Sequence, residues 1–122
     1  MKVLLVDDED DARMLAGMVL RHVGGMEVVE RADARGLVEA AAAERPDVIL
    51  LDVMLPEIDG PTALKSLLED ERTRAIPVAF FTAKAMASEL ERLKAAGARA
   101  VITKPFHPED LAAQVRALAP GA

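Results

Sequence analysis

An apolar run that ends in one carboxylate lies near the middle of the chain, at residues 48–56 with the sequence VILLDVMLP. The four apolar residues after Asp47 predict a strand that is buried on both faces, as in a parallel sheet. Asp52 then falls at the carboxyl end of that strand, and Pro56 and Asp59-Gly60 predict a loop after it. Open α/β sheets bind ligands just outside the carboxyl ends of their strands. The side chains that join Asp52 there are therefore the first candidates for function.

Apolar stretches alternate with apolar stripes at helical spacing along the rest of the chain. The stretches predict strands at residues 3–6, 26–30, 47–51, 76–81 and 99–103. Asp33 is the expected N-cap of the second helix, and Pro61 and Pro108 are expected in the first turns of the third and fifth helices. The apolar stripes of the five predicted helices are Ala12, Leu15, Ala16, Val19, Leu20 and Val23; Ala34, Leu37, Val38, Ala41 and Ala42; Ala63, Leu64, Leu67 and Leu68; Met86, Leu90 and Leu93; and Leu111, Val115 and Leu118.

This alternation predicts the fold class. Strands that are joined by helical crossovers run parallel, with right-handed connections. We therefore expect an α/β fold, a flavodoxin-like (βα)5 doubly wound sandwich with a five-stranded parallel sheet in the order 2-1-3-4-5. Periodicity does not give the order, but the polar second strand suits an edge and the apolar third strand suits the centre. Residues 1–122 are expected to form a single domain, with residues 119–122 as a tail or the start of a linker.

Composition excludes several classes of protein. The chain has 122 residues, 52% of them apolar and 30% charged, which suits one soluble globular domain. It contains no cysteine, so it forms neither a disulfide framework nor a thiolate metal site. No apolar run reaches the roughly 18 residues of a membrane span, and the N-terminus lacks the pattern of a signal peptide, so a cytoplasmic location is expected. A net charge of −6 and only three aromatic residues argue against direct nucleic-acid binding.

Five polar side chains follow four of the predicted strands. Asp7 and Asp8 end the first strand and Asp52 ends the third, which would be its neighbour in the sheet. Carboxylates so close together repel one another, and a bound Mg²⁺ would remove that conflict because it prefers oxygen ligands. Thr82 and Lys104 end the fourth and fifth strands and would add a hydroxyl and an ammonium. Such a set can hold a phosphoryl group, with one carboxylate as the nucleophile.

Each of these residues also has an ordinary interpretation when it is taken alone. The acidic run 7–11 is typical of a solvated helix start, Asp52 and Thr82 of turn or cap residues, and Lys104 of the surface. Four different strand ends at the same sheet edge make coincidence a poor explanation of the whole set, so the functional interpretation is preferred.

Over its whole length the chain resembles the response-regulator receiver domain, which is CheY-like and belongs to two-component phosphorelay signalling. The resemblance rests on the spacing of Asp8, Asp52, Thr82 and Lys104 and on four motifs: residues 3–9 (VLLVDDE), residues 50–56 (LLDVMLP) with Asp59-Gly60, residues 81–83 (FTA), and residues 104–106 (KPF).

The resemblance implies a role for each matching residue. Asp52 would accept phosphate from a sensor histidine kinase or a histidine phosphotransfer protein. Mg²⁺ would be bound by Asp7, Asp8, Asp52 and the backbone carbonyl of Met54, with Asp7 acting largely through water. Thr82 and Lys104 would bind the phosphoryl oxygens, small Ala83 would leave that group accessible, and the Lys104-Pro105 peptide would be cis. A downstream effector protein or a separate output domain would then respond.

Three positions are expected to modify this behaviour. The family usually has Tyr or Phe three residues before the lysine, where this chain has Val101, which is smaller, stiff at χ1 and without a hydroxyl. We expect switching in the region of the fourth helix, the fifth strand and the fifth helix to be weaker or to use another side chain. The side chains of Met54 and Lys84 flank the pocket in the family and would tune the access of water, although both also fit exposed loop positions.

Two other functions compete with the phosphorylatable receiver. An interaction module would keep the fold without taking phosphate. The complete set of acids, threonine and lysine argues against it, while Val101 at the usual aromatic position keeps it open. A true hydrolase of this chemistry generally has a second carboxylate two residues after the nucleophile. That position is Met54, so we expect self-modification at Asp52 rather than sustained enzyme turnover.

Overall fold

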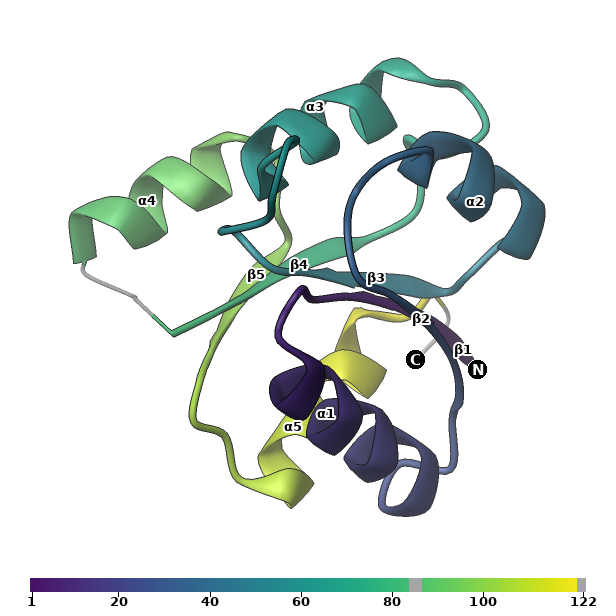
Figure 1. The fold of residues 1–122 in the computed structure, drawn as a ribbon, viewed down its shortest axis with the longest axis vertical. Helices are drawn as coiled ribbons and strands as arrows, with labels where there is room; N and C mark the ends of the chain where they lie inside the picture. The colour runs from purple at the N-terminus through teal and green to yellow at the C-terminus, as the bar shows by residue number, and fades with distance from the viewer. Residues whose placement is uncertain (84–86, 121–122) are drawn as a thin grey trace.

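A computed structural model describes residues 1–83 and 87–120 of the chain. In this part of the chain, strands and helices alternate from one end to the other (Figure 1). The elements are β1 (Lys2–Val6), α1 (Asp10–His22), β2 (Glu27–Arg31), α2 (Leu37–Glu44), β3 (Val48–Leu51), α3 (Gly60–Glu69), β4 (Val78–Thr82), α4 (Ala87–Ala95), β5 (Ala100–Thr103) and α5 (Pro108–Leu118).

The five strands form one parallel sheet in the order β2-β1-β3-β4-β5, which confirms the predicted topology. β3 lies at the centre, between β1 and β4, and all four of its residues are buried. This explains why its sequence is a continuous apolar run rather than an alternating one. The more polar β2 lies at one edge of the sheet and β5 at the other.

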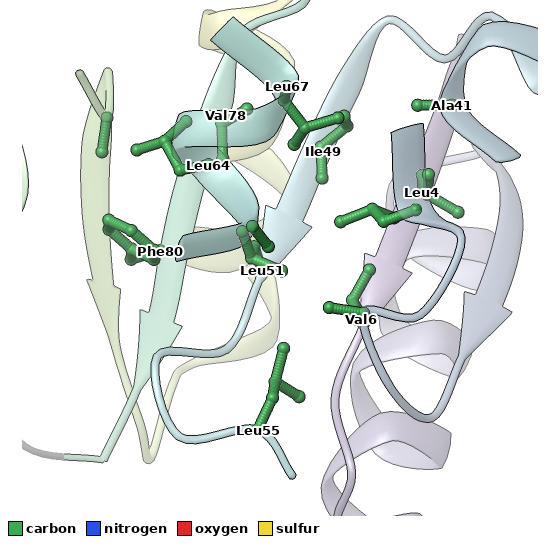
Figure 2. Packing of buried hydrophobic residues seen from close by; sticks show 14 of the residues in the cluster. Leu4, Val6, Ala41, Ile49, Leu51, Leu55, Leu64, Leu67, Val78 and Phe80 are labelled. Carbon is green, nitrogen blue, oxygen red and sulfur yellow. The ribbon is translucent and has the colours of Figure 1, made fainter. Parts of the chain in front are cut away.

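Helices cover both faces of the sheet (Figure 1). α2, α3 and α4 lie on one side, and α1 and α5 lie on the other. Because side chains alternate along a strand, each strand contributes to both cores. Figure 2 shows the core under α2 and α3, where Leu4, Ile49 and Phe80 of three strands meet Leu64 and Leu67 of α3. The second core joins the opposite side chains of the strands to α1 and α5, with Leu20 and Leu111 among its members.

Several local expectations were wrong. Leu15, Val23 and Leu68 were predicted on buried helix faces and are exposed. On α1 the buried face is narrow. Ala16, Val19 and Leu20 cover the core there, and Leu15 and Val23 lie outside that face. Met86, which was predicted in the stripe of the fourth helix, lies outside the described residues.

The start of α2 also differs from the prediction. Asp33 does not cap it, because its Oδ1 accepts a hydrogen bond of 3.0 Å from the backbone N–H of Arg35 and closes a local turn instead. The helix begins three residues after the predicted stripe does, behind Gly36, whose φ of +64° suits a residue without a side chain. β4 begins two residues later than predicted, after Pro77, and includes Thr82.

The turn after β3 has the predicted residues in their predicted roles. Asp59 caps α3 through a 2.8 Å hydrogen bond from the N–H of Thr62 to its carboxylate, and Pro61 lies in the first turn. Gly60 packs so tightly here that a Cβ atom would collide with the backbone carbonyl of Asp52. The start of α3 is therefore pressed against the end of β3. None of the helices in the described residues is long and apolar enough to cross a membrane.

Candidate functional site

The sheet brings the ends of β1 and β3 side by side. Val6 and Leu51 are the last paired residues of these strands, and the N–H of Asp52 donates a 3.0 Å hydrogen bond to the carbonyl of Val6. Asp7 and Asp52, the next residues along each strand, are thereby placed next to each other. Both are buried, with 0% and 5% of their surface exposed, whereas Asp8 is exposed.

The three aspartates form the predicted acidic cluster. One carboxylate oxygen from each of Asp7, Asp8 and Asp52 lies within 4.8 Å of the other two. All of these donors are oxygens, and two of the three side chains are held in fixed positions by burial. Such a donor set fits Mg²⁺, which binds through a few carboxylates and keeps several waters.

β4 and β5 bring the remaining two predicted side chains to the same edge of the sheet. Thr82 pairs with Thr103 at the end of these strands, and the N–H of Lys104 donates to the carbonyl of Thr82 at 2.9 Å. Thr82 is buried. The Lys104-Pro105 peptide is cis, as predicted.

Lys104 connects the two sides of the site. Its Nζ lies 2.6 Å from Asp7 Oδ2 and 3.2 Å from Asp52 Oδ2, and it is 4.0 Å from a carboxylate oxygen of Glu9. The other oxygen of each buried carboxylate accepts a backbone N–H, from Glu9 to Asp7 at 2.9 Å and from Met54 to Asp52 at 3.2 Å. The ammonium therefore partly neutralises a pair of carboxylates that have little access to water.

Burial controls the ionisation of Asp52. Removal from water raises the pKa of Asp52 to about 6, and the negative charge of Asp7 acts in the same direction. The charge of Lys104 and the hydrogen bond from Met54 oppose this shift without cancelling it. For Lys104, burial acts to lower the pKa, but the hydrogen bond with Asp7 and the charges of Asp52 and Asp7 outweigh it, so the pKa is raised. Lys104 thus stays positively charged at neutral pH.

A cleft of about 420 Å³ opens above this cluster. Its lining includes Asp8, Asp52, Met54, Thr82 and Lys104, all of which were predicted site residues. A larger hollow of about 560 Å³ lies at the amino ends of β3 and β4, between Arg45 and Ile76, and contains none of the predicted site residues. We assign the candidate site to the smaller cleft, because that is where buried charges converge.

Sequence reasoning missed several residues around the cleft. Arg13 of α1 donates a 2.7 Å hydrogen bond to the backbone carbonyl of Asp7 and pairs with Asp10, so it fixes the turn between β1 and α1. Its spacing of three residues from Asp10 on a helix is a signal that could have found it. Glu89 and Arg92 of α4 line the far side of the cleft, and no motif in the sequence marks them.

The positions that were expected to modify the site are Met54, Val101 and Lys84. Met54 directs its side chain into solvent, with 75% of its surface exposed. Val101 is half-buried on β5, where it pairs with Phe80 of β4 and packs against the core under α2 and α3. Lys84 lies outside the described residues.

Comparisons with known proteins agree with this geometry. The family model of the response regulator receiver domain matches residues 3–116. The phosphate regulon transcriptional regulatory protein PhoB of Escherichia coli is 37% identical over 117 residues, which are 96% of this chain and 51% of PhoB. The chain spans about half the length of the curated relatives it matches.

Solved structures show the same likeness. The chemotaxis protein CheY4 of Vibrio cholerae is 31% identical, with a TM-score of 0.87 over 96% of this chain and 97% of CheY4. The receiver domain of the sensor histidine kinase PA1611 of Pseudomonas aeruginosa, solved with a magnesium ion coordinated in its active site cleft, is 30% identical, with a TM-score of 0.86 over 96% of this chain and 95% of that domain. The chain therefore belongs to the response regulator receiver domain family of two-component signalling proteins.

Proposed function

We propose that Asp52 accepts a phosphoryl group from a phosphohistidine of a partner protein, with Mg²⁺ bound beside it, and that this modification shifts the domain between two conformations. The partner is a sensor histidine kinase or a histidine phosphotransfer protein. One observation carries the proposal: Lys104 bridges the buried carboxylates of Asp7 and Asp52, with the oxygens of Asp8 within reach, at the floor of a cleft that Thr82 also lines.

Mg²⁺ would be held by Asp7, Asp8, Asp52 and the backbone carbonyl of Met54. When bound, the cation offsets the negative charge that accumulates as an anionic phosphoryl group approaches three carboxylates. Support comes from the all-oxygen donor set of the aspartate cluster and from the magnesium ion in the cleft of the PA1611 receiver domain.

The transfer needs a carboxylate nucleophile and groups that bind the phosphoryl oxygens while the bond to phosphorus forms. A carboxylate oxygen of Asp52 forms a bond to phosphorus while the bond from phosphorus to the imidazole nitrogen of the donor breaks, and the nitrogen keeps the electron pair. Without metal the pKa of Asp52 is raised to about 6, so the carboxylate is mostly ionised at pH 7.5. Lys104 and Thr82 bind the phosphoryl oxygens, which carry the charge of the transition state.

A receiver domain acts through a component that responds to its conformation. We propose that the chain acts as a single receiver domain in the cytoplasm and that a downstream effector protein or an output domain responds to its conformation. We further propose self-modification rather than sustained turnover. The side chain two residues after Asp52 is the thioether of the exposed Met54, which cannot act as a general acid or base.

Incubation with acetyl phosphate and Mg²⁺, followed by intact-mass measurement, tests the proposal. We expect one adduct with the mass of a phosphoryl group, which is lost in Asp52→Asn and when EDTA removes the metal. Asp47→Asn is a matched control that removes an aspartate at the opposite end of β3 and should keep the adduct. A wild-type protein without an adduct would favour an interaction module, and continuous phosphate release over many turnovers would favour a hydrolase.

A further inference from the structure

Phe81 is a fully buried aromatic residue directly below the candidate site. It precedes Thr82 on β4, and its side chain belongs to the core under α1 and α5. Its ring packs against that of Phe106, with the ring centroids 5.6 Å apart and the planes tilted by 48°. Aromatic rings favour offset or tilted arrangements over face-to-face stacking, so this contact stabilises the orientation of both rings.

The ammonium group of Lys104 lies over the face of the Phe81 ring, 4.7 Å from the ring centroid. A cation within about 6 Å of an aromatic centroid is attracted by the negative potential of the ring face. Only 12% of the Lys104 side chain is exposed, so water screens this attraction less than it would at the surface. Nζ is therefore held from two directions, by the carboxylates of Asp7 and Asp52 and by an aromatic ring.

We propose that Phe81 is a positioning residue for Lys104, with a ring face that keeps the ammonium where it reaches Asp52 and the phosphoryl group bound there. The inference rests on the proposed function as far as the phosphoryl group is concerned.

A lysine needs such support more than most cations do. Its ammonium is a point charge at the end of a flexible four-carbon chain, and ordering that chain costs entropy. The contact with Asp52 also changes when the carboxylate carries a phosphoryl group. The attraction of the ring depends on neither carboxylate, so it acts before and after phosphorylation.

Phe80 provides a matched control on the same strand. It is equally buried, but it lies on the opposite face of the sheet, in the core under α2 and α3 (Figure 2). Within the described residues, the cation over an aromatic ring is Lys104 over Phe81, and Phe80 takes no part in such a contact. Replacement of either phenylalanine by leucine removes a similar volume from a core, and only replacement of Phe81 removes the ring beneath Lys104.

The first experiment compares Phe81→Leu with Phe80→Leu. Urea unfolding should show a comparable loss of stability in both variants. The rate of labelling by acetyl phosphate, measured under conditions where both are folded, should fall about fivefold more in Phe81→Leu than in Phe80→Leu. Equal labelling rates in the two variants would overturn the inference.

The second experiment separates the electrostatic effect from packing. Phenylalanine analogues with one, two and three ring fluorines, inserted at residue 81, weaken the negative ring face in steps while they almost conserve its shape. We expect the labelling rate to fall with each fluorine at residue 81 and to stay level for the same series at residue 106. A level series at residue 81 would show that Phe81 only fills space, and the inference would be wrong.

A measurement without phosphate distinguishes failure of this inference from failure of the proposed function. A methylene group next to an ammonium that lies over a ring has proton resonances shifted upfield by the ring current. We expect this shift for the ε-methylene protons of Lys104 in the wild type and in Phe80→Leu, and its loss in Phe81→Leu. If the wild type takes no phosphate, the proposed function fails while this shift still tests the contact; if the shift is absent from the wild type, the positioning role fails whether or not Asp52 is labelled.

Discussion

The two sides of the cleft are built from different parts of the sheet. On the acidic side, Asp7 and Asp52 end the central strands β1 and β3, and both side chains are buried. On the other side, Thr82 and Lys104 end β4 and β5, and β5 is an edge strand with only one of its four residues fully buried. Two side chains of α4 also line the cleft: Glu89, which is half-buried, and Arg92, which is exposed.

This difference indicates which parts of the site hold the reacting charges in place and which parts can move. Charges that must meet within a few ångströms are best carried by rigid, buried strand ends. An edge strand and a partly exposed helix can shift with fewer contacts to break. We therefore expect substitutions on the acidic side and at Lys104 to change stability and reaction strongly, and substitutions on β5 to change them little.

The largest effect is expected for Lys104→Met. It leaves Asp7 and Asp52 buried together without their shared cation, and breaking a buried ion pair from one side costs about 3 kcal/mol. Urea unfolding at pH 7.5 without divalent metal should show a loss of this size. Lys65→Met, at an exposed lysine of α3, should change stability by less than about 0.5 kcal/mol. Equal losses in the two variants would mean that the carboxylates do not depend on Lys104.

Asp52→Asn should have the opposite sign and a pH dependence. The pKa of Asp52 is raised to about 6 in the folded protein from about 3.9 in the unfolded chain. Its contribution to stability is therefore complete below about pH 4 and is lost as the pH rises through about 6. Asparagine stays neutral throughout, so the variant should be more stable than the wild type by about 3 kcal/mol at pH 7.5 without metal.

The same comparison at pH 4 provides the check. There the carboxyl group of the wild type is protonated in the folded state, and the advantage of Asp52→Asn should disappear. Urea unfolding of both proteins at the two pH values measures it. A variant that is less stable than the wild type at pH 7.5 would show that Lys104 stabilises the ionised carboxylate more than burial penalises it.

The polar second strand and the apolar third strand supported the strand order that the structure has, and the apolar runs predicted where the candidate site residues gather. Buried parallel strands are short apolar runs, so the residues that follow them are necessarily gathered at one edge of the sheet. Asp7, Asp52, Thr82 and Lys104 each come directly after such a run or end it, and the structure places them together.

Other features depend on contacts that periodicity does not contain. The stripe on α1 is apolar over a wider arc than the core can cover, so Leu15 is exposed although its spacing suits burial. The carboxylate of Asp33 accepts the backbone N–H of Arg35, so it closes a local turn instead of capping the helix. The contact between Lys104 and Phe81 joins residues of two neighbouring strands. The sequence does not show which aromatic ring the ammonium group of Lys104 contacts.

Thr82→Ala should affect the reaction less than a change of charge does. Thr82 is buried and lines the cleft, and loss of one hydroxyl donor to the phosphoryl oxygens should slow labelling about tenfold. Thr82→Ser keeps the hydroxyl and should recover most of the rate. Thr103→Ala, at the exposed register partner of Thr82 on β5, should label like the wild type. A slow Thr82→Ser variant would assign the effect to the lost methyl group.

The smallest effect on the reaction is expected at Val101 of the edge strand β5, whose register partner is Phe80 of β4. Val101→Ala should lower stability by about 1 kcal/mol, because it removes two half-buried methyl groups. Val29→Ala, on the opposite edge strand and against the same core, is its matched control. Both variants should label within about twofold of the wild-type rate, since neither side chain lines the cleft.

Val101 therefore tests whether reaction and response are separable. A β-branched side chain has few rotamers to exchange and no hydroxyl with which to follow the hydroxyl of Thr82. We expect the chemical-shift changes that phosphorylation causes in α4 and β5 to persist in Val101→Ala, as they should in Val29→Ala. If they vanish in Val101→Ala while labelling continues, Val101 transmits the signal in spite of its size. If they persist, the response reaches α4 through contacts other than those of Val101, and the reaction and the response are separable at this position.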